Sequence, residues 1–185
     1  HQGVIINGKI KAVLTEDPWS KTGTIAYYNQ ENRLLLEEQG WHGALNLYAR
    51  KFKPILGGDY RLTVSFESQE EEKLFGMGQY QQEVMDLKYC SLELAHRNSQ
   101  ASVPFLLSSR GYGFLWHNPA VGKVTFGKNV TQWESYSTKQ LDYWITAGDT
   151  PAEIEEAYAE ATGKVPMMPE YGLGFWQCKL RSVSY

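Results

Sequence analysis

Few side chains in this sequence are spaced for acid–base or metal chemistry. Glu83 and Asp86 stand three residues apart in an expected loop, where two carboxylates could act as a general acid and base. Solvated loop carboxylates are the simpler interpretation, and we expect that role for both, as we do for the acidic turn Glu70–Glu72. The histidines lack ligand-like spacing: His42, His96 and His117. We therefore expect no metal site and no cofactor.

Composition and charge argue against several partners. The chain has 185 residues, a net charge of -3 and a pI of about 5.8, whereas nucleic-acid and anionic-membrane partners call for a basic patch. Apolar runs such as 103–107 are too short to cross a bilayer. We expect no nucleic-acid or membrane partner. No signal-peptide apolar region is visible, and the compartment stays open with the cytoplasm favoured. Cys90 and Cys178 are expected to be free thiols.

Up to residue 147 the chain reads as short antiparallel strands. Val4–Ile6 and Ile10–Leu14 flank Asn7-Gly8, which predicts a two-residue hairpin turn because both residues tolerate positive φ. Apolar and polar residues alternate from Tyr60 to Glu67, which predicts a strand with one buried and one solvated face. Many short strands with regular turn signals are typical of a β-sandwich or barrel. Its packing should take up the tryptophans of the expected strands, which are Trp116, Trp133 and Trp144.

One helix is expected at about 150–162, where Thr150 can serve as the N-cap and Glu153 completes a capping box. The prolines of Lys164–Pro169 then predict an extended linker. We therefore divide the chain into a sandwich domain, 1–165, and a linker with the start of a second domain, 166–185. The first strand of that second domain would be Tyr171–Trp176.

Three blocks of sequence carry a family resemblance. They are 74–80 (LFGMGQY), 92–98 (LELAHRN) with 102–118, and 141–151 with the helix and then 169–181 (PEYGLGFWQCKLR). In this order they resemble the N-terminal domain of glycoside hydrolase family 31. The resemblance implies a mainly β fold, namely a galactose-mutarotase-like antiparallel β-sandwich with one short C-terminal helix. It also implies the first strand of a truncated (β/α)8 barrel. The Gly78-Gln79 pair with Lys88 is closer to the α-xylosidase branch.

The same resemblance implies which residues meet a sugar. The family's catalytic aspartates lie on later barrel strands, so no residue here is assigned a catalytic role. A sandwich loop reaches the sugar pocket, and the position of its acidic residue is Asn98, an amide that donates and accepts but carries no charge. Tyr80, Gln79 and Trp176 are the other substrate-binding candidates. The alternatives are an Asx turn for Asn98 and barrel packing for Trp176.

The implied parent is a retaining α-glycosidase, of α-glucosidase or α-xylosidase type, acting on an oligosaccharide or α-glycoside through two carboxyl groups. This chain would be its non-catalytic N-terminal domain, supporting the parent's own catalytic barrel and lending it a specificity loop. Alone it is expected to be inactive and to self-associate through an exposed barrel-facing surface. The tail 182–185 departs from the family pattern and suggests a truncation. The segment Tyr171–Trp176 is then expected to be disordered or an exposed edge.

Two other functions stay open. A free-standing carbohydrate-binding module would need a planar row of exposed aromatic rings. An aldose mutarotase would need a His–Glu acid–base pair in a cleft, and the spacing of His96 and His117 identifies no partner for either. Fold resemblance alone does not decide among these functions.

Overall fold

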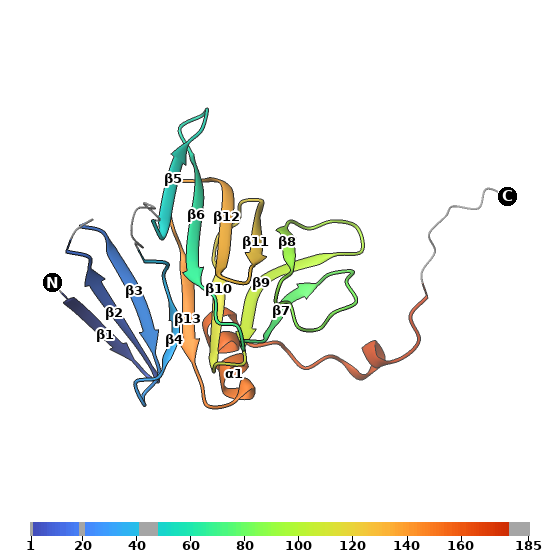
Figure 1. Ribbon diagram of the computed structural model, residues 1–185. Coiled ribbons are helices and arrows are strands. Elements are labelled where there is room, and N and C mark those ends of the chain that lie inside the picture. The colour runs from blue at the N-terminus through green and yellow to red at the C-terminus, as the bar shows by residue number, and fades with distance from the viewer. Residues whose placement is uncertain (1, 19–20, 41–47, 178–185) are drawn as a thin grey trace.

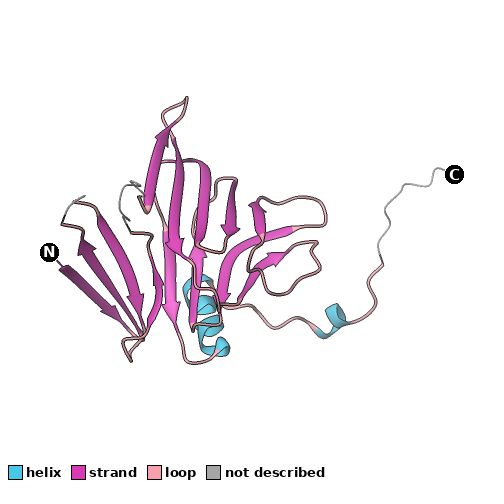
Figure 2. Ribbon diagram, in the orientation of Figure 1, coloured by secondary structure: helices cyan, strands magenta, loops and turns pink. Residues whose placement is uncertain are grey.

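The computed structural model describes residues 2–18, 21–40 and 48–177, which form three antiparallel sheets (Figures 1 and 2). The N-terminal sheet contains, in spatial order, β1 (Gln2–Asn7), β2 (Ile10–Glu16), β3 (Gly23–Tyr28) and β4 (Leu34–Glu37). The helix-side sheet contains β13 (Tyr143–Ala147), β10 (Tyr112–Trp116), β9 (Ala101–Ser108) and β7 (Leu74–Gln79). The five-stranded sheet contains β5 (Arg50–Pro54), β6 (Tyr60–Glu67), β12 (Val130–Thr138), β11 (Gly122–Phe126) and β8 (Ser91–Leu94).

An aromatic core lies between the helix-side sheet and the five-stranded sheet. The ring centroid of Phe114 in β10 lies 5.4 Å from that of Phe66 in β6 and 5.1 Å from that of Trp133 in β12. Trp116 stacks on Trp133 at 5.7 Å. These four side chains are buried, and Trp144 is half-buried. The expected antiparallel β-sandwich is therefore confirmed, with two of the three tryptophans at its centre.

The N-terminal sheet is joined to the sandwich by polar contacts. Glu38, directly after β4, forms a β-bridge with Phe66 of β6. The hydroxyl of Tyr27 in β3 lies 2.7 Å from the hydroxyl of Tyr143 in β13. Burial is the main reason that the pKa of both tyrosines is raised. All three sheets therefore meet at this junction.

The N-terminal hairpin forms as expected, but its turn is shifted by one residue. Asn7 pairs with Ile10 at the end of the strands, so the turn residues are Gly8 and Lys9 rather than Asn7 and Gly8. Gly8 takes a φ of +56°, which costs a glycine little because it has no Cβ. The shift puts Lys9 in the turn, where its Nζ lies 2.8 Å from Oε2 of Glu153 in the helix that follows β13.

Helix α1 (Pro151–Thr162) begins where the sequence predicts. Oγ1 of Thr150 accepts a hydrogen bond from the N–H of Glu153 at 3.3 Å, whereas the Glu153 carboxylate accepts from Asp149 at 2.9 Å instead of from Thr150. Ile154 is buried against the helix-side sheet beside Gly113 of β10. A Cβ on Gly113 would lie 2.6 Å from Cγ2 of Ile154, so the glycine allows the helix to approach the sheet.

The strand expected at Tyr171–Trp176 does not form. Glu170–Leu173 is a short 3-10 helix (η1), and the chain continues to residue 177 without pairing to any described strand. An isolated strand has no neighbour to satisfy its backbone groups, which explains the difference. This segment extends away from the body of the molecule (Figure 1), and Phe175 and Trp176 are 91% and 76% exposed. The domain boundary near residue 165 stays a prediction.

Some expectations fall outside the described residues, namely those on His42, Cys178 and the tail 182–185. Cys90 is a half-buried free thiol. Neither of the helices in the described ranges is long and apolar enough to cross a bilayer.

Candidate functional site

A glycine-dependent bulge in β7 precedes the loop after this strand. Gly76, Met77 and Gly78 have φ angles of +98°, +70° and +91°, and the pairing of β7 with β9 shifts between Gly76 and Gly78. A Cβ on Gly78 would lie 2.4 Å from the carbonyl oxygen of Ala101, closer than any side chain tolerates. The Gly-Met-Gly sequence of the first block is thus a backbone requirement, and it determines how the chain reaches Tyr80.

Tyr80 links the ends of three strands. Its hydroxyl donates to the carbonyl oxygen of Glu93 in β8 at 2.8 Å and lies 2.7 Å from Oγ of Ser102 in β9. Partial burial raises the pKa of this hydroxyl. Gln79, directly before it, is exposed. Tyr80 therefore holds the start of the loop in place, while Gln79 lies at the surface.

Asn98 lies at the tip of the loop after β8. Arg97 and Gln100 form a β-bridge around it, with the N–H of Gln100 donating to the carbonyl oxygen of Arg97 at 3.0 Å. Ser99 completes the turn with a φ of +67°. The Arg97 guanidinium holds Glu93 in a bidentate ion pair, with bonds of 2.7 and 2.6 Å, and lowers the pKa of that carboxylate. Asn98 is exposed on a tightly hydrogen-bonded turn.

The far end of the loop after β7 is anchored by Asp86 and Lys88. Oδ1 of Asp86 accepts from the N–H groups of Leu74 and Lys88, both at 3.0 Å. Lys88 is buried, and its Nζ donates to Ser68 Oγ and to the Gln69 carbonyl oxygen, both at 2.6 Å. Burial lowers the pKa of the Lys88 ammonium. Asp86 is therefore a structural residue of the loop, and the expectation that it is solvated was wrong.

Glu72 is also structural, which corrects the expectation of a solvated turn. It is 6% exposed, and its Oε1 accepts from Ser108 Oγ at 2.5 Å and from the Tyr112 hydroxyl at 2.7 Å. Burial first, and then the charge of Glu72, raise the pKa of Tyr112 well above its ordinary value. Because these partners lie 36 and 40 residues away along the chain, an acidic run in the sequence gives no signal of them.

The loops after β7 and β8 protrude on the same side of the molecule, away from β1 (Figure 1). Gln79, the last residue of β7, and Asn98, in the loop after β8, are therefore exposed where these two loops protrude. The C-terminal segment that carries Trp176 also extends away from β1 (Figure 1), and there Nε1 of Trp176 donates to the Gly172 carbonyl oxygen at 2.8 Å.

The two histidines that the structure describes, His96 and His117, are not hydrogen-bonded to a glutamate. Nδ1 of His117 lies 2.8 Å from Oδ2 of Asp142 at the surface, and Nδ1 of His96 accepts from the N–H of Ser102 at 3.3 Å. Glu83 is exposed, as expected. Within residues 2–18, 21–40 and 48–177, no group of three or more His, Cys, Asp or Glu side chains could hold a metal ion.

Known proteins are similar to this chain along nearly its whole length, although no protein-family model matches it. The chain is 53% identical over 193 residues to a Pseudescherichia vulneris protein described as an uncharacterized family 31 glucosidase, covering 95% of this chain and 35% of that protein. It is 32% identical over 131 residues to an α-xylosidase of Saccharolobus solfataricus, covering 66% of this chain and 18% of the relative.

A solved structure is also similar to this chain along nearly its whole length. The crystal structure of a family 31 α-xylosidase from a soil metagenome, complexed with xylose, superposes with a TM-score of 0.89 at 51% identity. The match covers 97% of this chain and 28% of that one. The chain thus spans about a third or less of the length of these relatives.

Proposed function

Because the chain is a relative of the N-terminal domain of glycoside hydrolase family 31 enzymes, we propose that it is the non-catalytic front domain of a retaining α-glycosidase. The parent would hydrolyse an α-glucoside or α-xyloside, with xylosides favoured because the solved relative and the Saccharolobus solfataricus relative are α-xylosidases. The observation that carries the proposal is 53% identity along 95% of this chain to a protein of which it spans 35%.

Two of the described acidic residues, Glu72 and Asp86, are engaged in structural hydrogen bonds. A retaining glycosidase needs two carboxyl groups about 5–5.5 Å apart in an open site, one as nucleophile and one as acid and base. Glu72 is buried between two hydroxyl groups, and Asp86 binds backbone N–H groups. Neither is free to attack a sugar, so the proposal assigns the catalytic pair to the remainder of the parent.

The loop after β7 is held at both ends, which suits it to present side chains to a sugar. Tyr80 fixes the start of the loop after β7, and Asp86 with Lys88 fixes its end. Such anchoring keeps loop side chains in one geometry, which lowers the entropy lost when a sugar binds. We assign sugar contacts to Asn98 and Gln79, with Tyr80 acting mainly through its hold on the loops.

The C-terminal segment supports a barrel-facing role. Its large apolar side chains are mostly exposed, and these are Val165, Met167, Met168, Tyr171, Leu173, Phe175 and Trp176. Such a strip is unfavourable in water, and the catalytic barrel of the parent would cover it. In this chain alone the strip favours self-association. Trp176 would then pack in the barrel or border the sugar pocket.

The two alternatives gain less support. The aromatic pair Phe52 and Tyr60 is edge-to-face at 84°, not the planar row that a free-standing binding module on this surface would use. The contacts of His96 and His117 do not resemble the acid–base pair of a mutarotase.

A paired assay tests the proposal with aryl α-glucoside and aryl α-xyloside as substrates. One sample is this chain, and the other is the same chain continued to the end of its gene. Turnover only by the long form supports the proposal, and the better substrate identifies the branch. Turnover by this chain alone, or by neither sample although both are folded, would overturn it.

A further inference from the structure

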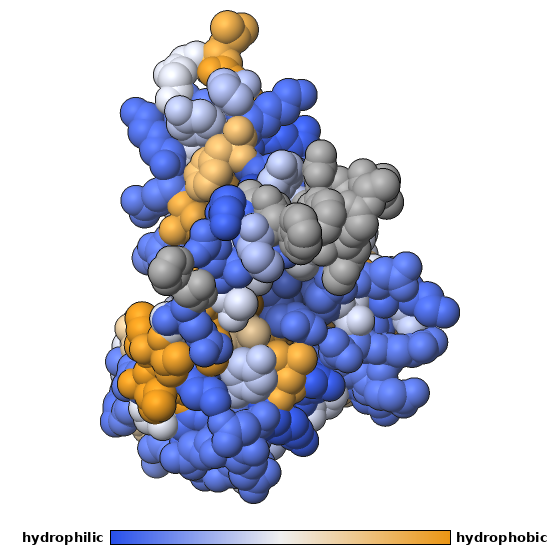
Figure 3. Space-filling model, turned by 60° about the vertical axis from the view of Figure 1, so that its left-hand side comes forward, coloured by the Kyte–Doolittle hydropathy of each residue, from blue (hydrophilic) through white to orange (hydrophobic). Residues whose placement is uncertain are grey.

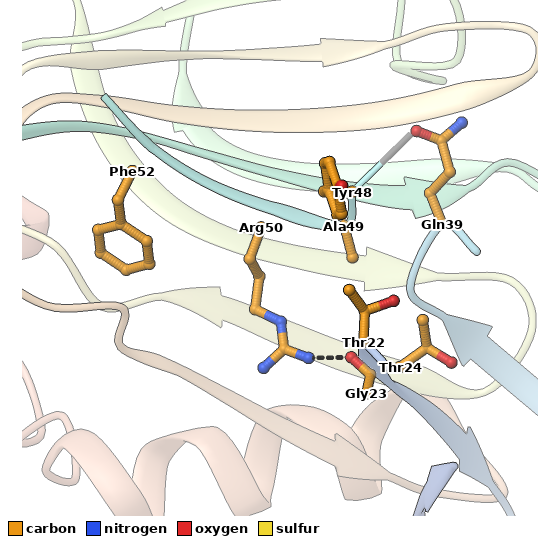
Figure 4. A pocket seen from close by; sticks show the side chains of 8 residues that line it. All are labelled: Thr22, Gly23, Thr24, Gln39, Tyr48, Ala49, Arg50 and Phe52. Carbon is orange, nitrogen blue, oxygen red and sulfur yellow. Dashed lines mark hydrogen bonds between the residues drawn. The ribbon is translucent and has the colours of Figure 1, made fainter. Parts of the chain in front are cut away.

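A cavity of about 320 Å3 lies between the start of β3 and the start of β5, away from the loops after β7 and β8 (Figures 1 and 4). Its volume is within the range of small-molecule sites, about 300–1,000 Å3. The side chains that line the cavity include those of Thr22, Thr24, Gln39, Tyr48, Arg50 and Phe52. None of them belongs to the loops discussed above.

The β5 wall of the cavity alternates aromatic and cationic side chains. Arg50 and Phe52 are spaced two residues apart in β5, the spacing that puts side chains on one face of a strand. Tyr48 lies two residues before the strand and also lines the cavity. Figure 4 shows Arg50 and Phe52 leaving β5 on the same side. Tyr48 and Phe52 are each 44% exposed. The Phe52 ring packs edge-to-face against Tyr60 with the ring centroids 5.9 Å apart, which restricts its orientation.

The charge of Arg50 is balanced inside the protein. Its Nη2 lies 3.1 Å from Oε2 of Glu38, a fully buried side chain, and donates to the carbonyl oxygen of Gly23. These contacts fix the guanidinium plane. The guanidinium has five N–H donors in all, so the bonds through Nη2 leave others for a ligand. A ligand in the cavity would therefore meet the free N–H donors of Arg50, whose positive charge is offset by the carboxylate of Glu38.

The walls of the cavity are rigid. Ser65 of β6 accepts from the N–H of Gln39 at 2.9 Å and donates to the carbonyl oxygen of Ala49 at 2.8 Å. Ser65 is 2% exposed, although the alternation in β6 predicted a solvated face there, and these bonds satisfy its buried backbone groups. Gln39 and Ala49, which both line the cavity, are thereby attached to one core strand, and Arg50 donates to Gly23 at the start of β3. Such preorganisation lowers the cost of binding.

We propose that this cavity binds one neutral pyranose unit of an α-glycoside, as a second carbohydrate site separate from the loops after β7 and β8. The apolar face of a sugar ring matches the exposed rings of Tyr48 and Phe52. Its hydroxyl groups match the donors and acceptors of Arg50, Thr24 and Gln39. Exposed aromatic rings beside a guanidinium that is already paired with Glu38 suit a neutral sugar better than a phosphate or a carboxylate. The site would hold substrate near the enzyme without taking part in hydrolysis.

The test is a titration of this 15N-labelled chain with methyl α-xyloside and methyl α-glucoside, followed by amide chemical shifts. We expect a Kd on the order of 1–10 mM for at least one sugar, with the largest shifts at Thr24, Gln39 and Arg50. Tyr48→Ala and Phe52→Ala should each weaken binding about 3- to 10-fold. Tyr48→Phe keeps the ring, so its Kd for the sugar should stay within about 2-fold of the value for the unmodified chain.

Tyr136→Ala is the matched control, because Tyr136 is 38% exposed and does not line the cavity. The sugar affinity of this variant should be unchanged. Thermal unfolding verifies that each variant is folded. Shifts that are absent at 100 mM sugar (about ten times the weakest expected Kd), or that map to the loops after β7 and β8, would overturn the proposal. So would glucuronate binding more than about tenfold tighter than the glucoside, since that would mean an anion site. The readout involves no hydrolysis, so it is independent of the parent's catalytic activity.

Discussion

The hydroxyl of Tyr112 lies 2.7 Å from Oε1 of Glu72, and both residues are buried in the sandwich. Glu72 lies just before β7 and the first block, and Tyr112 opens β10 in the second block, so the bond joins these two parts of the chain. Ser108 of β9 donates to the same carboxylate oxygen. A buried carboxylate is tolerated only with such partners.

Tyr112→Phe is expected to destabilise the chain, because it removes one of these two donors and leaves the buried charge under-satisfied. The expected loss in the free energy of unfolding is about 1–3 kcal/mol, measured by denaturant unfolding. Tyr136→Phe, at a partly exposed tyrosine, is the control and should change stability by less than about 0.5 kcal/mol. Equal effects of the two changes would contradict the role of Glu72.

A substitution at the glycine bulge in β7 should destabilise the chain in two ways, through positive φ and through a steric clash, and these can be measured separately. Gly78→Ala forces a residue with a Cβ into positive φ and also pushes that Cβ to 2.4 Å from the Ala101 carbonyl oxygen. Gly57→Ala has the same kind of φ, +99°, but open space around the Cβ. Gly78→Ala should therefore cost about 1–3 kcal/mol more than Gly57→Ala in unfolding experiments. Similar costs would mean that the strand relaxes around the methyl group.

Tyr80→Phe tests whether Tyr80 positions the loops. Losing the bonds to Glu93 and Ser102 should reduce stability by about 1–2 kcal/mol. In the long form of the enzyme it should also lower kcat/KM by about tenfold, because a displaced loop misplaces its sugar contacts. Tyr89→Phe, in the same loop and 60% exposed, is the control. Unchanged kcat/KM in Tyr80→Phe would argue against the loop's role in specificity.

Glu38 should give the chain a pH-dependent stability. Burial raises the pKa of this carboxyl above its ordinary 4.5, so the folded chain binds the proton more tightly than the unfolded chain. The resulting stability is complete below pH 4.5 and is lost as pH rises through the folded-state pKa. Relative to Glu38→Gln, the parent chain should therefore lose free energy of unfolding as pH rises from 4.5 toward neutrality. Parallel pH profiles of the two chains would contradict this.

Removal of residues 164–185 tests the role of the apolar segment. Helix α1 ends at Thr162, so the sandwich and its Tm should change little. Self-association at high concentration, followed by light scattering, should fall because Phe175 and Trp176 are removed. A shortened chain that still associates would point to another surface. The candidate is the N-terminal sheet, which exposes the apolar side chains Val4, Ile5 and Ile6 of β1, and Figure 3 shows a patch of apolar side chains low on this face of the molecule.

Local sequence determined much of this fold. Alternation in β6 identified Leu62, Val64 and Phe66 as buried, and Thr150 with Glu153 marked the start of α1. These predictions succeed because strand alternation, helix capping and turn preferences depend on residues a few positions apart. The three blocks, read together, also indicated the family to which the chain is related.

Only the tertiary structure decided which polar residues are structural. Glu72 and Asp86 looked like solvated residues, yet both make hydrogen bonds to partners distant in the chain. Tyr80 was a sugar candidate and also proved to join three strands. Tyr171–Trp176 has the sequence of a strand but lacks a described partner to pair with. Burial and pairing depend on what folding brings alongside, and that information is spread over the whole chain rather than held in any local pattern.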